Sequence, residues 1–165
     1  MKLYRIILVD DEEEVRKSII HKIKWEENGF LVAGDAENGE DALEKIEALE
    51  PDLILTDIRM PYMDGLTLAE RVRQKYPSMK IVIFSGYDDF EYAKQAIKLN
   101  VTEYILKPVN VEELTAILQK IKANLDQEIE QKRNVNLLRE NYIKSLPILR
   151  EQFLNELVNA PVASE

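Results

Sequence analysis

The sequence contains no cysteine, one histidine and one tryptophan among its 165 residues. Without cysteine, disulfide bonds and thiolate chemistry are excluded, which fits a reducing cytoplasm. The first apolar stretch is far shorter than that of a signal peptide, and acidic residues follow it at once. Apolar residues at 45% and charged residues at 32% are typical of a globular chain. We therefore expect a cytoplasmic protein with no membrane partner.

Positive charge is also scarce: 22 lysines and arginines face 31 aspartates and glutamates, for a formal net charge of −9. A chain that binds nucleic acid by neutralising phosphates needs a basic surface, which this composition does not supply. Any contact with DNA would need another segment.

Residues 1–121 alternate short β-rich runs with amphipathic stretches, the pattern of repeated βαβ units. We predict strands at Tyr4–Val9, Phe30–Ala36, Leu53–Asp57, Ile81–Ser85 and Glu103–Leu106, and helices at Glu13–Lys24, Gly39–Leu49, Leu66–Tyr76, Phe90–Leu99 and Val111–Ile121. The expected fold class is α/β: a doubly wound, flavodoxin-like sheet of five parallel strands in the order 2-1-3-4-5.

Polar residues stand where three of the predicted strands end. Asp10 and Asp11 follow the first strand, Asp57 ends the third, and Lys107 follows the fifth. The carboxyl ends of parallel strands share one edge of a sheet, so these groups should lie together. Two negative charges about 5 Å apart repel by roughly 3 kcal/mol at an effective dielectric constant near 20. A hard divalent cation is the obvious neutralising partner, and Mg²⁺ prefers such oxygen ligands.

Each of these residues also has a simpler explanation. Asp11 could cap the following helix, Asp57 could be the polar end of a strand, and Lys107 could be solvent-exposed. Ser85, before Gly86, could belong to an ordinary turn. The joint placement at successive strand ends favours a common site, because structure alone would not require it.

Residues 122–165 are expected to form a helical linker. This linker is either solvated, or it is an arm that pairs two protomers as a coiled coil or carries a signal onward. Its apolar residues recur at intervals of three and four residues. They continue a seam that begins in the preceding helix. The seam comprises Leu114, Leu118, Ile121, Leu125, Val135, Tyr142, Leu146, Leu149 and Phe153, and is interrupted at Glu128, Lys132 and Arg139. Pro147 lacks an amide hydrogen, so we predict a break near Leu146 and a second short helix through Val158.

Four strings, LVDDEEEVR, DIRMPYMDG, FSGYDD and EYILKPV, resemble the receiver domain of two-component response regulators. They occur in that family's order and cover about residues 3–121. The resemblance implies a signalling module that takes a phosphoryl group from a sensor histidine kinase and controls an output.

The resemblance also implies a role for each strand-end residue. Asp57 would be the phosphoacceptor, attacking a phosphohistidine to form an acyl phosphate. Asp11 would bind Mg²⁺ directly, Asp10 would help through water, and the backbone carbonyl of Arg59 would supply another oxygen. Lys107, with the metal, would neutralise charge on the phosphoryl oxygens. Mn²⁺ would suit the same oxygen ligands.

Two further residues are assigned by the resemblance. Ser85 would bond the new phosphoryl group, and Tyr104 would be an aromatic switch that turns inward when Ser85 moves; alternatively, Tyr104 is an ordinary strand residue. The Lys107–Pro108 bond is typically cis in this family, and we predict a cis bond here.

A narrower likeness concerns receivers that precede an AraC-type helix-turn-helix domain. It rests on FSGYDDFEYAKQAIKLNVTEYILKPV, on WEENGF after the first helix, and on LPILREQFLNELV in the tail. The subgroup implies transcription regulation, a homodimer, and DNA binding through a C-terminal domain that this chain does not contain. Asn100 stands where relatives often carry glycine, and asparagine tolerates a left-handed helix end.

Two alternatives remain open. A dehalogenase-like phosphohydrolase also forms an aspartyl phosphate, but it usually carries a second aspartate two residues beyond the nucleophile. That position is Arg59 here, which favours a stoichiometric acceptor over an enzyme. The second alternative is a receiver that acts independently of phosphate.

Overall fold

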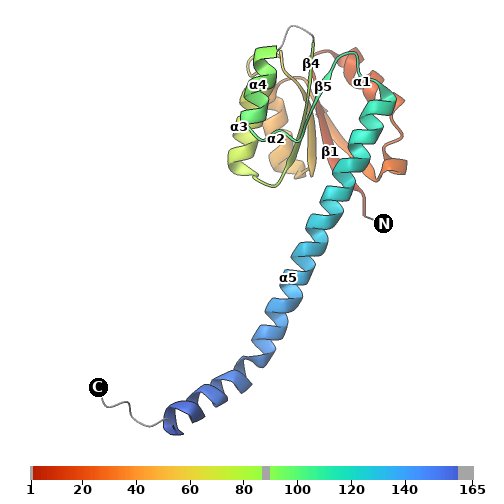
Figure 1. Cartoon of the computed structure of the whole chain (residues 1–165). Coiled ribbons are helices and arrows are strands. Elements are labelled where there is room, and N and C mark those ends of the chain that lie inside the picture. The colour runs from red at the N-terminus through yellow and green to blue at the C-terminus, as the bar shows by residue number, and fades with distance from the viewer. Residues whose placement is uncertain (1, 87–89, 160–165) are drawn as a thin grey trace. The chain divides into compact units, whose positions relative to one another are not determined.

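Five parallel strands form the central sheet of the computed structural model, in the order β2-β1-β3-β4-β5 (Figure 1). The structure describes residues 2–86 and 90–159, and for residues 90, 92, 93 and 146–159 it describes the backbone alone. The strands are β1 (Tyr4–Val9), β2 (Phe30–Ala36), β3 (Leu53–Asp57), β4 (Lys80–Ser85) and β5 (Glu103–Leu106). The helices are α1 (Glu13–Lys22), η1 (Glu26–Asn28, a short 3-10 helix), α2 (Gly39–Leu49), α3 (Gly65–Lys75), α4 (Phe90–Lys98) and α5 (Val111–Asn159). The predicted fold class and strand order are confirmed.

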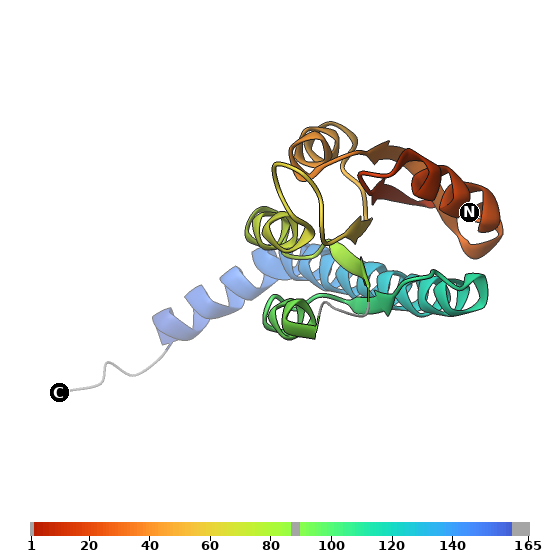
Figure 2. The same ribbon diagram turned by 90° about the horizontal axis from the view of Figure 1, so that it is seen from above.

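Helices cover both faces of the sheet. Figure 2 shows α2, α3 and α4 on one face, and α1 with the beginning of α5 on the other. Alternate residues of β1 therefore pack in opposite directions: Ile7 and Val9 belong to the core cluster that contains residues of α2 and α3. All five residues of β3 are buried. This central strand ends at Asp57, which places a carboxyl group at the end of the best-buried element of the sheet.

Helix α1 ends at Lys22, two residues earlier than we predicted. Ile23 has an extended backbone, with φ −96° and ψ 136°, and its side chain is buried. The indole Nε1 of Trp25 donates a 3.0 Å hydrogen bond to the carbonyl of Ile20 in the last turn. The chain thus leaves the helix to bury two apolar side chains, a tertiary effect that overrides the helical pattern.

The chain divides into two units, residues 1–122 and 123–165. In the part of the chain that the structure describes, no helix combines the length and the apolar character needed to cross a bilayer. Helix α5 begins in the first unit and forms the second.

The predicted break near Pro147 is wrong, because α5 runs without interruption to Asn159. A proline removes one amide donor from the helical ladder, and the turns on either side keep their own hydrogen bonds. The side chains of Leu146, Leu149 and Phe153 lie outside the described residues.

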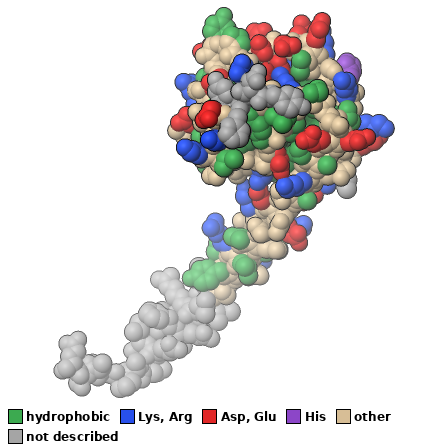
Figure 3. Space-filling view, turned by 45° about the horizontal axis from the view of Figure 1, so that its top comes forward, with side chains coloured by type: hydrophobic (Ala, Val, Ile, Leu, Met, Phe, Trp, Pro, Cys, Tyr) green, Lys and Arg blue, Asp and Glu red, His purple; other side chains and the backbone are tan. Residues whose placement is uncertain are grey.

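The seam along α5 divides into a buried and an exposed part. Leu114, Leu118, Ile121 and Leu125 are buried within the single chain, so they are not available to a second copy. Val135 and Tyr142 are exposed, as are Leu137, Leu138 and Ile143. Figure 3 shows hydrophobic side chains at the surface of the second unit, among charged ones.

Candidate functional site

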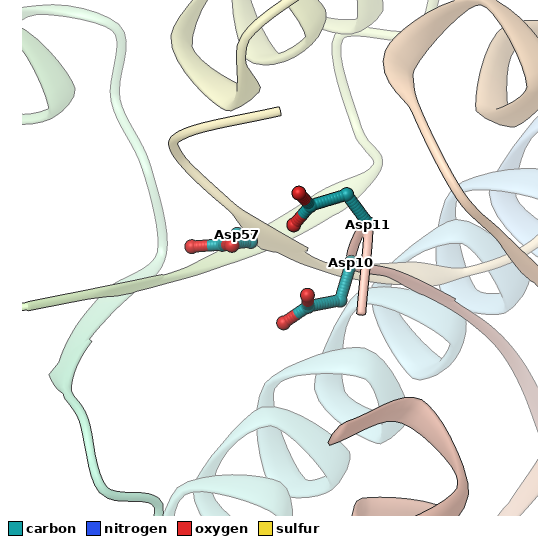
Figure 4. A group of neighbouring side chains, drawn as sticks. All are labelled: Asp10, Asp11 and Asp57. Carbon is teal, nitrogen blue, oxygen red and sulfur yellow. The ribbon is translucent and has the colours of Figure 1, made fainter. Parts of the chain in front are cut away.

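Three carboxylates meet at the carboxyl end of the sheet. One oxygen from each of Asp10, Asp11 and Asp57 lies within 4.8 Å of the others, and Figure 4 shows the three side chains pointing to the same side of the strand ends. Strands β1 and β3 are neighbours, with Val9 opposite Thr56. The parallel register therefore brings together groups that are far apart in the sequence, as predicted.

Asp10 is completely buried and is held from several sides. Its amide donates to the carbonyl of Ala36 at 3.1 Å. Its Oδ1 accepts from the amide of Glu12 at 2.9 Å, and its Oδ2 lies 3.2 Å from Nζ of Lys107. These bonds fix the carboxylate in one orientation before any ligand arrives.

Asp57 is buried, with 8% of the residue exposed. Its Oδ1 accepts a 2.8 Å hydrogen bond from the amide of Ile58. Burial raises the pKa of Asp57, the negative charge of Asp10 raises it further, and the nearby Lys107 lowers it in part. The surroundings of Asp57 therefore disfavour the charged form of its carboxyl group.

Lys107 reaches the pocket from the end of β5. Its Nζ lies 3.2 Å from Oδ2 of Asp10 and 3.2 Å from Oδ2 of Asp57. Burial alone would lower the pKa of Lys107, but the charges of Asp57 and Asp10 raise it above its ordinary value. The amine is therefore a cation at neutral pH, and the exposed-lysine explanation is wrong. The bond between Lys107 and Pro108 is cis, which confirms the prediction.

Ser85 and Tyr104 form a hydroxyl pair beside the pocket. Ser85 ends β4 and is fully buried, and its Oγ is hydrogen-bonded to the hydroxyl of Tyr104 from β5. The ring of Tyr104 also packs against the core cluster that contains Ile83 and Ala96. Tyr104 is thus linked to the strand end through its hydroxyl and to the core through its ring.

Asp11 and Arg59 occupy more open positions, and both are exposed. Helix α1 has Glu12 at its N-cap position, with no side-chain cap hydrogen bond, so Asp11 does not cap that helix. Its carboxylate belongs to the acidic cluster instead. The predicted use of the Arg59 carbonyl as a ligand stays a prediction.

Two residues that the sequence analysis did not select contact backbone oxygens at the site. The amide of Gly65, the first residue of α3, donates to the carbonyl of Ile58 at 2.7 Å. A β-carbon at position 65 would lie 2.0 Å from the carbonyl oxygen of Asp57, so only glycine fits there. Arg16 donates from Nη1 to the carbonyl of Asp10 at 2.5 Å. Both residues lie inside the strings LVDDEEEVR and DIRMPYMDG, which was the available signal.

The donor set fits a hard divalent cation. Three carboxylate oxygens within 4.8 Å of one another match the ligands that Mg²⁺ takes from proteins. Burial raises the pKa of Asp57, and the negative charge of Asp10 raises it further. A cation in this pocket would relieve that repulsion.

Known proteins resemble this chain in sequence and in structure. The chain is 37% identical to the transcriptional regulatory protein YesN of Bacillus subtilis, across 94% of this chain and 42% of that protein. It is 31% identical to the transcriptional regulatory protein HptR of Staphylococcus aureus, across 95% of this chain and 61% of that protein. The REC domain of AraT, a response regulator from Geobacillus stearothermophilus, superposes with a TM-score of 0.73 at 39% identity, covering 76% of this chain and 98% of that one.

These matches concern one part of longer proteins, since the chain spans about two fifths of YesN and three fifths of HptR. A two-component transcriptional regulator AraC from Clostridium phytofermentans matches with a TM-score of 0.70 at 35% identity, covering 76% of this chain and 98% of that one. Residues 6–119 match the family model of the response regulator receiver domain. The chain therefore belongs to the response regulator receiver family of two-component signalling.

Proposed function

We propose that Asp57 accepts a phosphoryl group from a sensor histidine kinase. The observation that carries the proposal is the position of its carboxylate, which ends β3 between two further carboxylates within 4.8 Å and an ammonium group at 3.2 Å. Receiver domains bind Mg²⁺ at an acidic pocket of this kind, and Mn²⁺ would suit the same hard oxygen ligands. We propose Asp10, Asp11, Asp57 and the Arg59 carbonyl as the residues that hold the ion.

In the reaction, an oxygen of Asp57 forms a bond to phosphorus while the phosphorus–nitrogen bond of the phosphohistidine breaks. The electron pair stays on the imidazole nitrogen, and the product is an acyl phosphate. Lys107, already 3.2 Å from Oδ2 of Asp57, would pair with a phosphoryl oxygen. A bound Mg²⁺ supplies charge neutralisation for the same oxygens.

Signalling then proceeds through Ser85 and Tyr104. The Ser85 hydroxyl is bonded to that of Tyr104, and a hydroxyl can donate one bond while accepting another. Ser85 can therefore donate to a phosphoryl oxygen while Tyr104 donates to Ser85. Phosphorylation would bias Tyr104, and with it the face formed by α4, β5 and the beginning of α5, toward one of two arrangements.

We propose a stoichiometric acceptor and not a turnover enzyme. A dehalogenase-like phosphohydrolase usually carries its acid–base aspartate two residues after the nucleophile, and Arg59 occupies that position here. Hydrolysis of the acyl phosphate would then be slow and would serve to reset the signal.

The output is proposed to be transcription, through an AraC-type DNA-binding domain. Support comes from the names of the relatives, two of which are transcriptional regulatory proteins and one a two-component regulator AraC. A cytoplasmic homodimer is part of this proposal. The exposed apolar residues of the second unit, Val135, Leu138 and Tyr142, support a helical interface between protomers.

Acetyl phosphate with Mg²⁺ tests the proposal directly. The wild-type chain should gain one phosphoryl group by intact mass, and Asp57→Asn should gain none. Beryllofluoride with Mg²⁺ should shift the oligomeric state of the wild type only. Equal behaviour of the two proteins would show that a phosphate switch does not operate, and Asp57-dependent turnover of small phosphomonoesters would favour the hydrolase.

A further inference from the structure

Arg16 of α1 contacts both the segment that follows β1 and the end of β2. Its guanidinium Nη1 donates to the carbonyl of Asp10 at 2.5 Å, and its Nε donates to Oδ2 of Asp35 at 2.8 Å. The side chain of Arg16 is only 12% exposed. Lys45 from α2 donates to the backbone carbonyl of Asp35 and to Oδ2 of Asp41. The guanidinium thus ties the segment after β1 to the end of β2.

The carbonyl that Arg16 holds belongs to the peptide bond between two members of the acidic cluster. A peptide group is planar, so fixing the oxygen of Asp10 also fixes the direction in which the chain reaches the α-carbon of Asp11. The carboxylate of Asp10 has its own anchors in Glu12 and Lys107. Asp11 is exposed. The restraint on the peptide bond fixes its α-carbon and therefore limits the positions that its carboxylate can take.

Charge neutrality is a second feature of this contact. A lone guanidinium near the pocket would repel a cation, but Arg16 is paired with the carboxylate of Asp35 at 2.8 Å. The pair holds the carbonyl while adding no net positive charge. Residues that orient metal ligands from outside the coordination sphere typically change metal affinity by about 10-fold to 100-fold when removed.

We propose that Arg16 is a positioning residue for the divalent cation, which orients the Asp10–Asp11 peptide so that both carboxylates face Asp57. This inference rests on the proposed Mg²⁺ site. The planar guanidinium is essential to this role, because two of its nitrogen atoms bond the carbonyl of Asp10 and the carboxylate of Asp35 at the same time. A lysine has a single ammonium nitrogen and does not reproduce this fixed geometry.

Calorimetric titration of the full chain with MgCl₂ tests the proposal in wild type, Arg16→Gln, Arg16→Lys and Lys17→Gln. Lys17 is the matched control, since it is the next cation on α1 and pairs with Glu13 at the surface. We expect the dissociation constant for Mg²⁺ to rise about tenfold or more in both Arg16 variants and to stay within about twofold in Lys17→Gln. Thermal unfolding in EDTA records separately any loss of stability.

The alternatives give different results. If Arg16 acted only through its charge, Arg16→Gln would bind Mg²⁺ more tightly and Arg16→Lys would match wild type. If Arg16 only stabilised the fold, its variants would unfold at lower temperature in EDTA with unchanged Mg²⁺ affinity. Either result overturns the proposal. A wild type that does not bind Mg²⁺ would overturn the proposed site as well, so the two failures are distinguishable.

Phosphorylation by acetyl phosphate supplies a second measurement. Because Arg16 touches the carbonyl of Asp10 and no reacting atom, its variants should need about tenfold more Mg²⁺ for half-maximal rate. Their rate at saturating Mg²⁺ should stay close to that of wild type. A loss confined to the maximal rate would contradict a positioning role. If Arg16→Gln does not fold, the Mg²⁺ affinity of Arg16→Lys still tests the proposal.

Discussion

The carboxyl group of Asp57 lies in surroundings that disfavour its charge, chiefly through burial and secondly through Asp10. Its pKa in the folded chain is above that in the unfolded chain. The folded state therefore holds the proton more tightly, and this stabilising contribution is complete below the unfolded pKa and is lost as pH rises through the folded pKa. At neutral pH the charge of Asp57 lowers the stability of the metal-free protein.

Asp57→Asn should accordingly raise the melting temperature in EDTA by a few degrees at about pH 7. The gain should shrink as the pH falls through the raised pKa of Asp57, because the carboxyl group of the wild type then becomes protonated. Asp64→Asn is the control, because Asp64 caps α3 and asparagine caps a helix about as well as aspartate. A melting temperature below that of wild type at neutral pH would contradict the prediction.

At the residue scale, the carboxylates and the amine of the site were predictable from the sequence, but the residues that contact backbone oxygens were not. Asp10, Asp57 and Lys107 were predictable because carboxylates and an amine at strand ends indicate a site. The amide of Gly65 donates to the carbonyl of Ile58, and Arg16 donates to the carbonyl of Asp10. A backbone carbonyl has the same chemistry at every position, so side-chain chemistry alone does not indicate which one needs a partner; the only signal was that both residues lie inside the matching strings.

At the scale of elements, the strands were predictable because each is a short β-rich run between helical stretches, and the three central strands β1, β3 and β4 are almost entirely buried. Four of the five strands have the predicted bounds, and β4 begins one residue earlier, at Lys80. Helix ends were less predictable, since tertiary contacts decide them, as the burial of Ile23 does at the end of α1. Asn100 has the left-handed backbone, φ 56°, that asparagine was expected to tolerate there.

Arg73 of α3 joins two connections of the fold through three backbone carbonyls. Its Nη1 donates to the carbonyls of Pro77 and Met79 at 2.7 and 2.9 Å, and its Nη2 to that of Asn100 at 3.0 Å. Burial lowers the pKa of Arg73. The guanidinium therefore ties the α3–β4 connection to the α4–β5 connection, beside the face that is proposed to respond to phosphorylation.

Arg73→Lys should lower the free energy of unfolding by about 2 kcal/mol, because a single ammonium leaves carbonyls without their donor. Urea denaturation measures the effect. Arg71→Lys, an exposed substitution on the same helix, should change it by less than about 0.5 kcal/mol. Equal stabilities of the two variants would show that the three-way contact does not stabilise the fold.

At the scale of the whole molecule, two units suggest separate tasks. Residues 1–122 contain the sheet and the acidic pocket, whereas the described residues of the second unit, 123–159, are helical. The tail was harder to interpret from sequence, because its apolar seam combines residues buried within the chain with residues that are exposed. Spacing alone does not distinguish an intramolecular contact from an intermolecular one.

Truncation after Asp126, which retains the buried Leu125, should abolish self-association and leave Mg²⁺ affinity unchanged. Sedimentation velocity and calorimetry measure the two properties. In the full chain, replacing Val135, Leu138 and Tyr142 with serine should have the same effect, whereas replacing the exposed Asn134, Asn136 and Asn141 should not. If the truncated chain still dimerises as well as the full chain, the interface lies in the first unit, on the face formed by α4, β5 and the beginning of α5.

The close approach of Gly65 to Asp57 has a mechanical consequence. A β-carbon on the first residue of α3 would collide with the carbonyl oxygen of Asp57, so the start of this helix packs directly against the end of β3, although residues 58–64 connect the two along the chain. The amide of Gly65 also donates to the carbonyl of Ile58 at 2.7 Å. A shift of the Asp57 backbone would therefore reach the first turn of α3 by direct contact, and any side chain at position 65 would force the two elements apart.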